Sequence, residues 1–265
     1  MPTPFEQYGN VISHAIAVML SLVGVDELLK RSRTTVQLCV ACVYGTLLCG
    51  VFLSSTGFHL CCLMQRYPTA RRVLHFCDRM VIYLFIAASY MPWLLLAQSE
   101  YDMLMQFACA AMWLCAAFGT MHQFRCVVGA SSCMHHRVLE SKKAEEADED
   151  RSFLRPEPAS EQQSEAERPA KEDEHPVPHG HRMPHVPPTV IFYVAYATCP
   201  AVILCMVHQH AGLSELAFGG LFYLCGIVFF KLDGILPLAH TVWHTFVTLG
   251  AATQFFAIRN HFFPL

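Results

Sequence analysis

The stretch GILPLAHTVWH, from Gly234 to His244, opens the last long apolar run of the chain, which ends at Ile258. A bilayer is crossed by about 20 predominantly apolar residues, so this run predicts a membrane-spanning helix. His240 and His244 are four residues apart and point the same way from a helix. This is the spacing with which one helix offers two imidazole nitrogens to one metal ion. The alternative is a pair of histidines that reach toward the membrane interface from a helix end.

The composition of the whole chain favours a membrane protein. Of 265 residues, 54% are hydrophobic and 15% are charged. Thirteen of the 21 acidic residues lie between Glu140 and Glu174, which leaves the remainder very poor in charge. Long stretches of this kind are typical of membrane helices, and no nucleic-acid partner is expected.

Six further apolar runs complete the prediction of an all-α membrane protein, a seven-transmembrane helix bundle. Four spans occupy residues 1–126 and three occupy residues 189–265. A basic loop broken by Pro68 is expected before the third span. The predicted spans are Tyr8–Leu29, Val36–Met64, Cys77–Gln98, Met103–Phe124, Thr189–Val207, Leu213–Phe230 and Ile235–Ile258.

Between the fourth and fifth spans, residues 127–188 form a long predicted loop. This segment is rich in Glu, Lys, Ser and Pro and has few large apolar residues, so it cannot bury enough surface to fold and is expected to be disordered. Histidine-rich tracts bind metal weakly, but a solvated linker is the preferred interpretation. A cytosolic protein partner is expected for this loop. Its histidines are His175, His179, His181 and His185.

The distribution of basic residues predicts a cytosolic N-terminus. The loops after the second, fourth and sixth spans hold Arg66, Arg71, Arg72, Arg125, Arg137, Lys142, Lys143 and Lys231, whereas the opposite side carries four basic residues, Lys30, Arg31, Arg33 and Arg259. Three of those four lie in the first loop, at Lys30, Arg31 and Arg33, and they oppose this orientation.

Polar side chains of four spans are predicted to gather at one membrane face. With seven spans, the N-terminus and the loops after the second, fourth and sixth spans share one side of the membrane. Scattered structural polar residues would divide between both faces. For the three that belong to the first span, a role in anchoring or in joining helices is favoured. The eight residues are Glu6, Asn10, His14, Ser55, His59, Asp78, His240 and His244.

His59, His240 and His244 together predict a shared zinc ion. Three imidazoles with an open fourth position are typical of a catalytic zinc, which lowers the pKa of a bound water to about 7. Asp78 would accept the proton of that water or orient it, and Ser55 would hold either by a hydrogen bond. The alternatives are that Asp78 caps its helix, that Ser55 bonds to its own helix, and that the zinc is structural.

At these residues the chain resembles the progestin and adipoQ receptor family, which includes bacterial haemolysin III-like proteins. Within that family it is most similar to the monocyte-to-macrophage differentiation-associated subgroup. The matching stretches are E-x-x-x-N-x-x-x-H at Glu6 to His14, S-x-x-x-H at Ser55 to His59, CDRMVIYLFIAASYMPW from Cys77, GLSELAFGGLFYLCGIVFFKLDGILPLAH from Gly212, and HTVWH from His240.

The resemblance implies a seven-helix bundle with a cytosolic N-terminus. It also implies a zinc ion bound by His59, His240 and His244, with Ser55 and Asp78 beside it. Relatives of the subgroup suggest the Golgi or other endomembranes, and the plasma membrane is the alternative location.

Two functions follow as hypotheses. One is a zinc-dependent hydrolase of a membrane lipid amide such as ceramide, since some relatives look like ceramidases. The other is a receptor or signalling scaffold for steroid, lipid or protein ligands, in which the zinc is structural. A metal or proton transporter is a third and weaker hypothesis, because the far halves of the second and seventh spans are nearly all apolar.

Overall fold

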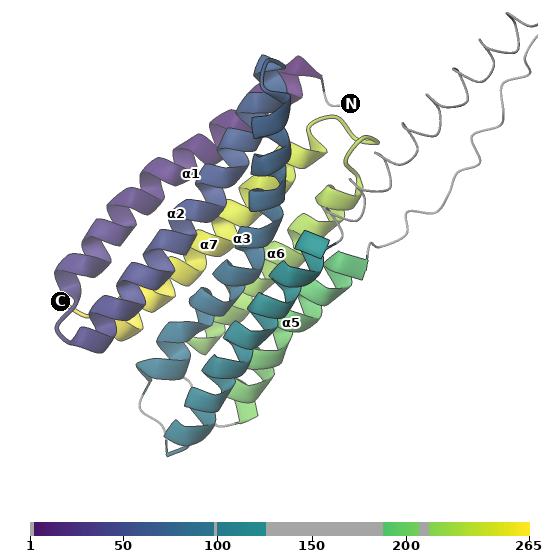
Figure 1. Ribbon diagram of the computed structural model, residues 1–265. Coiled ribbons are helices and arrows are strands. Elements are labelled where there is room, and N and C mark those ends of the chain that lie inside the picture. Colours follow the sequence, from purple (N-terminus) through teal and green to yellow (C-terminus); the bar gives the residue numbers. More distant parts are fainter. Residues whose placement is uncertain (1–2, 98–99, 126–187, 207–211) are drawn as a thin grey trace, which may run out of the picture. The chain divides into compact units, whose positions relative to one another are not determined.

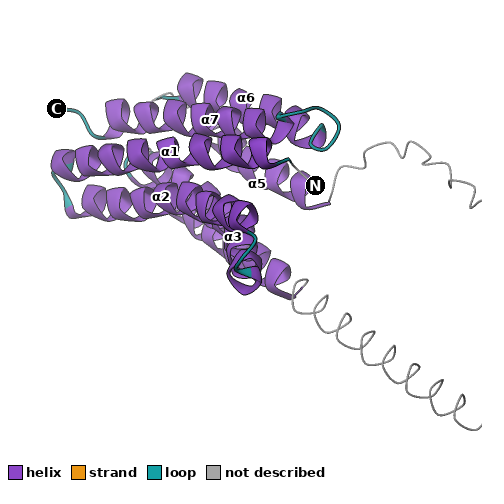
Figure 2. Ribbon diagram, turned by 90° about the horizontal axis from the view of Figure 1, so that it is seen from above, coloured by secondary structure: helices purple, strands orange, loops and turns teal. Residues whose placement is uncertain are grey.

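The computed structural model describes residues 3–97, 100–125, 188–206 and 212–265, except for the side chains of residues 188 and 189. The described residues form seven helices joined by turns and contain no strand (Figure 2). The helices are α1 (Pro4–Arg31), α2 (Thr35–Met64), α3 (Pro68–Leu95), the unlabelled helix Asp102–Arg125, α5 (Pro188–Met206), α6 (Leu213–Lys231) and α7 (Ala239–Phe262).

The all-helical architecture that the sequence predicts is therefore confirmed. The predicted loop 127–188 lies outside the described residues, apart from Pro188, where α5 begins. Its disorder, its protein partner and the division of the chain at residues 126 and 189 stay predictions.

Hydrogen-bonded caps define the starts of the first two helices. The Thr3 hydroxyl accepts from the Glu6 backbone N–H, while the Glu6 carboxylate accepts from the Thr3 backbone N–H. Thr34 and Gln37 form the same reciprocal arrangement at α2. Such capping boxes satisfy amide groups that a helix start leaves without partners. The cap places the start of α1 four residues before the predicted Tyr8.

The third helix begins at Pro68 instead of the predicted Cys77. Proline is tolerated in the first turn of a helix because the N–H that it lacks would have no helical partner there. The predicted basic loop is therefore the first part of α3, and Pro68 starts a helix where a break was expected. Asp78 consequently lies about 15 Å along α3, so it does not cap the helix.

The last helix begins at Ala239, and not at Ile235. The segment before it forms successive turns, with Gly234 at φ 80° and Leu238 at φ 60°. The backbone N–H of Leu238 donates to the Glu6 carboxylate, 3.0 Å away in α1. This tertiary contact fixes the end of the turn, so that the first helical turn carries His240.

Five helices are long and apolar enough to cross a membrane by length and composition, namely α1, α2, α3, Asp102–Arg125 and α6. In α5 the apolar helical segment, Val190–Met206, is shorter. The seventh helix has the length but carries histidine, threonine, glutamine and arginine side chains, which lower its mean hydropathy. The sequence predicts seven spans, and seven helices are present in the described part of the chain.

The helices pack side by side. Helix α1 lies between α2 and α7, and α6 lies against α7 (Figure 2). Helix α3 lies beside α2 (Figure 1). Helix α5 contacts both α3 and α6, which completes a ring of neighbours. The helix Asp102–Arg125 joins α5 through the Tyr196 hydroxyl, which donates to the Met112 carbonyl at 2.6 Å. The starts of α1, α3 and α7 and the end of α2 consequently lie at one end of the bundle.

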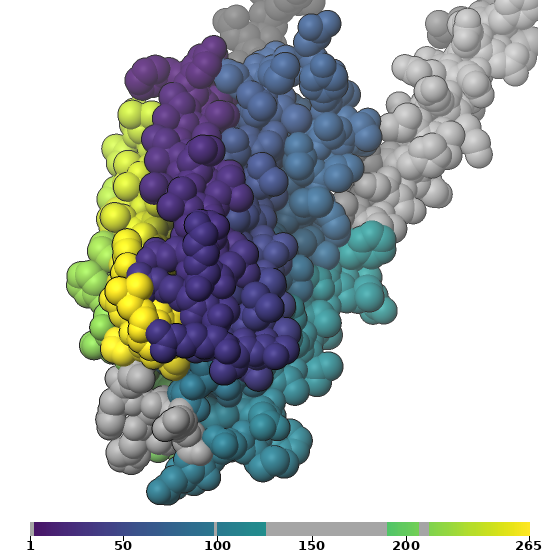
Figure 3. Space-filling model, turned by 90° about the vertical axis from the view of Figure 1, so that its left-hand side faces the viewer, coloured from purple at the N-terminus to yellow at the C-terminus, as the bar shows by residue number. Residues whose placement is uncertain are grey.

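Helix α1 shows how the bundle is packed for a lipid environment. Its inner stripe consists of buried polar and small residues from Asn10 to Gly24, followed by Leu28. Its outer stripe exposes large apolar side chains, among them Ile16, Leu20 and Val23. This arrangement is the reverse of a soluble helix, because lipid solvates the apolar side and small residues let helices approach closely. In Figure 3 the surface of α1 lies between those of α7 and α2.

Candidate metal centre

Three histidines from two helices converge at the end of the bundle where the N-terminus lies. Their ring centroids are 5.1 Å apart for His59 and His240, 5.0 Å for His59 and His244, and 4.6 Å for His240 and His244. One nitrogen of each ring lies within 4.8 Å of the other two. His59 and His244 are buried, with 4% and 2% of their surface exposed. The three side chains can therefore hold one metal ion, as the sequence predicts.

Helix periodicity explains how each histidine reaches this point. His240 and His244 lie one turn apart on one face of α7, because successive turns bring residues four apart into register. His59 lies in the last turns of α2, on the stripe that also buries Phe52 and Ser55. Contact between α1 and both of these helices brings the two stripes together.

The second nitrogen of every histidine in the trio has its own polar partner. His59 Nδ1 lies 3.0 Å from the Gln7 amide oxygen, and His240 Nδ1 lies 3.0 Å from an Asp233 carboxylate oxygen. His244 Nδ1 lies 3.3 Å from the Ser13 hydroxyl oxygen. In metal sites such partners fix the orientation of the ring and raise its basicity as a ligand.

These partners also determine which nitrogen is free to bind a metal. The amide oxygen of Gln7 and the carboxylate of Asp233 are acceptors, so Nδ1 of His59 and of His240 must carry the proton. The Ser13 hydroxyl donates to the Asn10 carbonyl at 3.0 Å, which leaves its oxygen to accept from His244. All three rings are therefore protonated at Nδ1, and each presents the lone pair of Nε2 to a cation.

Asp78 and Ser55 lie beside each other. Ser55 is buried one turn before His59 on α2, and its side chain interacts with the Asp78 carboxyl group of α3. Asp78 does not belong to the set of mutually close ligand atoms, which the three histidines alone form among the described residues. The structure thus brings the three predicted metal ligands together, and it places Asp78 beside Ser55, one turn before His59.

The first helix joins the site through its own polar residues. Besides the bond from Leu238 to Glu6, the Thr241 hydroxyl donates to the Asn10 side-chain oxygen at 2.7 Å. Both contacts connect α1 to the start of α7, which confirms their predicted role in joining helices. His14 goes beyond that role, because its ring stacks on His244 with centroids 3.7 Å apart and planes 22° apart.

Sequence reasoning misses Gln7, Ser13 and Asp233. Asp233 has a weak signal, since it precedes Gly234 in the turn just before the metal-ligand pair. Gln7 and Ser13 have none, because their roles depend on histidines that lie in other helices.

Of the other histidines that the sequence analysis considered, His75 and His122 lie in described helices. His75 was assigned by its position to the solvated surface, but it lies within α3, partly buried, with its ring 4.8 Å from that of Phe58. The helix Asp102–Arg125 exposes His122, as expected. His208, His210 and the four histidines of the predicted loop lie outside the described residues.

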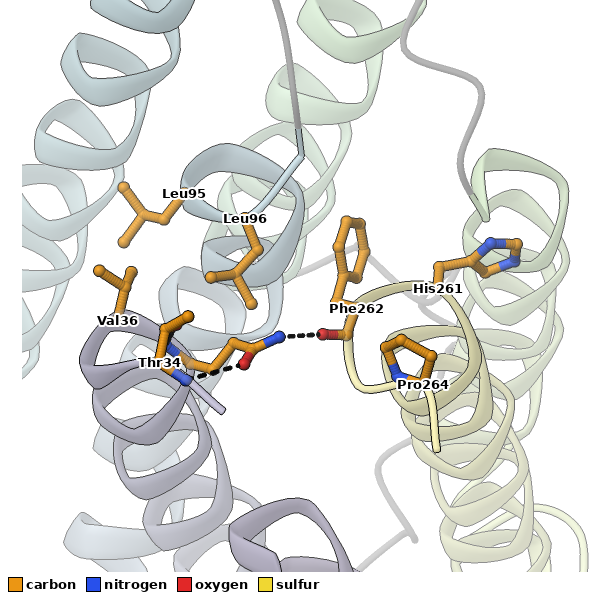
Figure 4. A pocket seen from close by; sticks show the side chains of 8 residues that line it. Thr34, Val36, Leu95, Leu96, His261, Phe262 and Pro264 are labelled. Carbon is orange, nitrogen blue, oxygen red and sulfur yellow. Dashed lines mark hydrogen bonds between the residues drawn. The ribbon is translucent and has the colours of Figure 1, made fainter. Parts of the chain in front are cut away.

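A cavity of about 420 Å³ lies at the opposite end of the bundle (Figure 4). It is formed where α2 begins and where α3 and α7 end. Two of its lining residues are joined by a hydrogen bond, in which the Gln37 side-chain amide donates to the Phe262 carbonyl at 2.9 Å. The cavity contains none of the predicted site residues. It is lined by Thr34, Val36, Gln37, Leu95, Leu96, His261, Phe262 and Pro264.

Comparison with known proteins gives a family match along most of the chain. The family described as "Haemolysin-III related" matches residues 4–255, a range that includes the trio and all three Nδ1 partners. Monocyte to macrophage differentiation factor of Homo sapiens is 32% identical over 263 residues, covering 99% of this chain and 87% of the relative. The Mus musculus protein of that name gives the same values. Hemolysin-3 of Bacillus cereus is 22% identical over 265 residues, covering 98% of this chain and 93% of the relative.

Proposed function

The chain belongs to the haemolysin-III related family, and from this premise we propose that it is a zinc-dependent hydrolase of a membrane lipid amide, similar to a ceramidase. Family membership confirms the resemblance that the motifs indicate and makes the chain a multi-pass integral membrane protein. One observation carries the proposal of a metal enzyme. Three buried or partly buried imidazoles converge, and the Nδ1 of each is held by a partner that leaves Nε2 for a metal.

Zinc is the metal that suits this donor set best. Neutral imidazole nitrogens are borderline ligands that zinc accepts readily in tetrahedral sites. Three protein ligands leave the fourth position for water or substrate, as in catalytic zinc centres, whereas structural sites have four protein ligands. When bound, the zinc supplies a water activated for attack at neutral pH.

Asp78 and Ser55 provide the proton chemistry in this proposal. The Asp78 carboxylate accepts a proton from the attacking water and returns it to the amide nitrogen as the carbon–nitrogen bond breaks. The products are a fatty acid and an amine. Ser55 interacts with Asp78, and in this proposal it orients the Asp78 carboxylate. Ser55 is a positioning residue, because it acts through Asp78.

The position of the site suits a substrate that is held in the membrane. The site lies at one end of a bundle whose outer surface is apolar, so a lipid headgroup and the site are at similar depth. His240 is the accessible member of the trio, with 21% of its side chain exposed next to Asp233. A ceramide-like amide or a steroid would approach from this side.

Asp78→Asn separates catalysis from metal binding. We expect the purified variant to keep its zinc and its unfolding temperature, while the release of fatty acid from a ceramide-type amide falls about 10²- to 10⁴-fold. Zinc is measured by elemental analysis and fatty acid by mass spectrometry. The control is Asp102→Asn, an exposed carboxylate at the start of another helix. A zinc-loaded wild-type protein that releases no fatty acid from such amides would overturn the proposal.

A receptor or signalling scaffold with a structural zinc is the second candidate. The observation in its favour is that Gln7 and Ser13 of α1 hold histidines of α2 and α7, so that a metal would tie three helices together. In that case Asp78→Asn leaves signalling intact and His240→Ala destabilises the protein.

Orientation, location and partners complete the proposal. The excess of basic residues supports an N-terminus, and with it a histidine trio, on the cytosolic side of a Golgi, other endomembrane or plasma membrane. The acidic segment 127–188 then lies in the cytosol and binds a protein partner there.

A further inference from the structure

Asn10 and His14 carry buried polar atoms that have no hydrogen-bond partner. The atoms are Nδ2 of Asn10 and both ring nitrogens of His14. The residues are 0% and 4% exposed. Elsewhere among the described residues only the hydroxyl oxygens of Tyr44 and Tyr223 are in this condition. Three of five such atoms thus lie in one turn of α1, beside the histidine trio.

Both side chains are held by other contacts. The oxygen of the Asn10 amide accepts from the Thr241 hydroxyl at 2.7 Å, which orients the amide. Its NH₂ group has no hydrogen-bond partner. The His14 ring is held by its stack on His244 and by the edge of Phe52, 5.3 Å away at 77°. A buried polar group without a partner lowers stability, so such groups in native proteins commonly serve binding or catalysis.

The geometry points to Asn10 and His14 as the subsite that binds the amide group of the lipid. This inference rests on the proposed function and adds the residues that recognise the substrate. The Asn10 NH₂ and the His14 N–H donate to the amide carbonyl oxygen, and the second His14 nitrogen accepts from a donor on the lipid, such as the amide N–H or a hydroxyl. Donors preplaced at a carbonyl also stabilise the negative charge that develops on its oxygen during hydrolysis.

The chemistry of the pair selects a neutral ligand. Both residues offer uncharged donors in a buried position, whereas phosphate and carboxylate groups are usually bound by Arg and Lys. The pair also offers an acceptor, which an amide can use and an ester cannot. An amide is therefore expected to bind more tightly than the matching methyl ester or free fatty acid.

His14→Phe tests the inference, because it keeps the ring that stacks on His244 and removes both nitrogens. The probe is a ceramide-type amide bound to the protein in nanodiscs, with Asp78→Asn present in every sample to prevent turnover. We expect about a tenfold or greater loss of amide affinity, with zinc content unchanged and the unfolding temperature equal or higher. His14→Gln, which keeps a donor and an acceptor, is expected to restore part of the affinity.

The control variant is His75→Phe. His75 is a partly buried histidine near His59, and its nitrogens are not among the buried atoms without a partner. It should bind the amide as the unmodified protein does. Equal amide binding by His14→Phe, or the loss of zinc and of thermal stability in that variant, would overturn the inference and leave the proposed function standing. If the zinc-loaded parent neither binds nor hydrolyses any lipid amide, the proposed function and this inference fall together.

Discussion

The Asp233 carboxylate decides which nitrogen His240 offers to a metal. It accepts from Nδ1 at 3.0 Å, and Gln7 and Ser13 act in the same way on the other two histidines. The sequence places the trio by spacing, but the chemistry of each ring depends on these neighbours. Of the three, Asp233 is the charged partner and should have the largest influence on its ligand.

At the residue scale, Asp233→Ala is therefore expected to weaken zinc binding about 10- to 100-fold, which is the usual effect of removing a group that orients a metal ligand. The measurement is competition for zinc against a calibrated chelator. Asp233→Asn, whose amide oxygen still accepts, should lose less, and Ser13→Ala should lose least because its contact is longer. Equal affinity in Asp233→Ala and wild-type protein would show that His240 needs no such partner.

At the element scale, the packing of α6 on α7 positions two of the three ligands. A Cβ added at Gly226 of α6 would lie 2.7 Å from the Trp243 ring and 2.9 Å from the Phe246 Cβ. Trp243 lies directly before His244, so the glycine lets the two helices approach at the level of the site. At Gly220, on the same helix, a Cβ would meet no atom within 4 Å.

Gly226→Ala and Gly220→Ala form a matched pair. The first is expected to destabilise the protein by about 1–3 kcal/mol through overpacking and to lower its zinc content. The second should be neutral or stabilise by about 0.5–1 kcal/mol, because alanine favours the helix more than glycine does. Thermal unfolding in detergent compares the two. Similar unfolding temperatures for both variants would contradict the role of Gly226 in close packing.

At the scale of the whole molecule, polar contacts join neighbouring helices at both ends of the bundle. At the metal end α1 holds α2 and α7 through Gln7, Asn10 and Ser13. At the other end Glu27 of α1 pairs with Arg31 and with Arg259 of α7, at 2.7 Å in each case. The two ends are separated by the length of the apolar interior, so they should act independently on stability and metal binding.

Glu27→Ala is expected to reduce stability by about 1 kcal/mol or less, because the group is partly exposed to solvent. Its zinc content should stay the same, since the site lies at the opposite end of the bundle. The neighbouring Asp26→Ala is the control, because Asp26 and its partner Lys30 are largely exposed and contact no other helix through this pair. Thermal unfolding and elemental analysis of both variants check this, and zinc loss in Glu27→Ala would show that the two ends are coupled.

Local properties of the sequence determine the helices of this protein and the side chains that share a helix face. Long apolar runs specify helices in a membrane, since an unpaired backbone group costs free energy in lipid. The four-residue spacings of Ser55 with His59 and of His240 with His244 specify which side chains share a face. The count of spans then predicts which helix ends meet. These three properties were enough to find the helical architecture and the three histidines that converge.

The tertiary structure alone decided where α7 begins, which nitrogen of each ligand is free, and that His14 stacks on His244. The start of α7 depends on Glu6, and the orientation of His244 depends on Ser13, across separations of 232 and 231 residues. A local pattern carries no information about a contact of that kind. The physical reason is that a buried polar atom takes its partner from whichever helix packs against it, and the packing follows from the whole bundle.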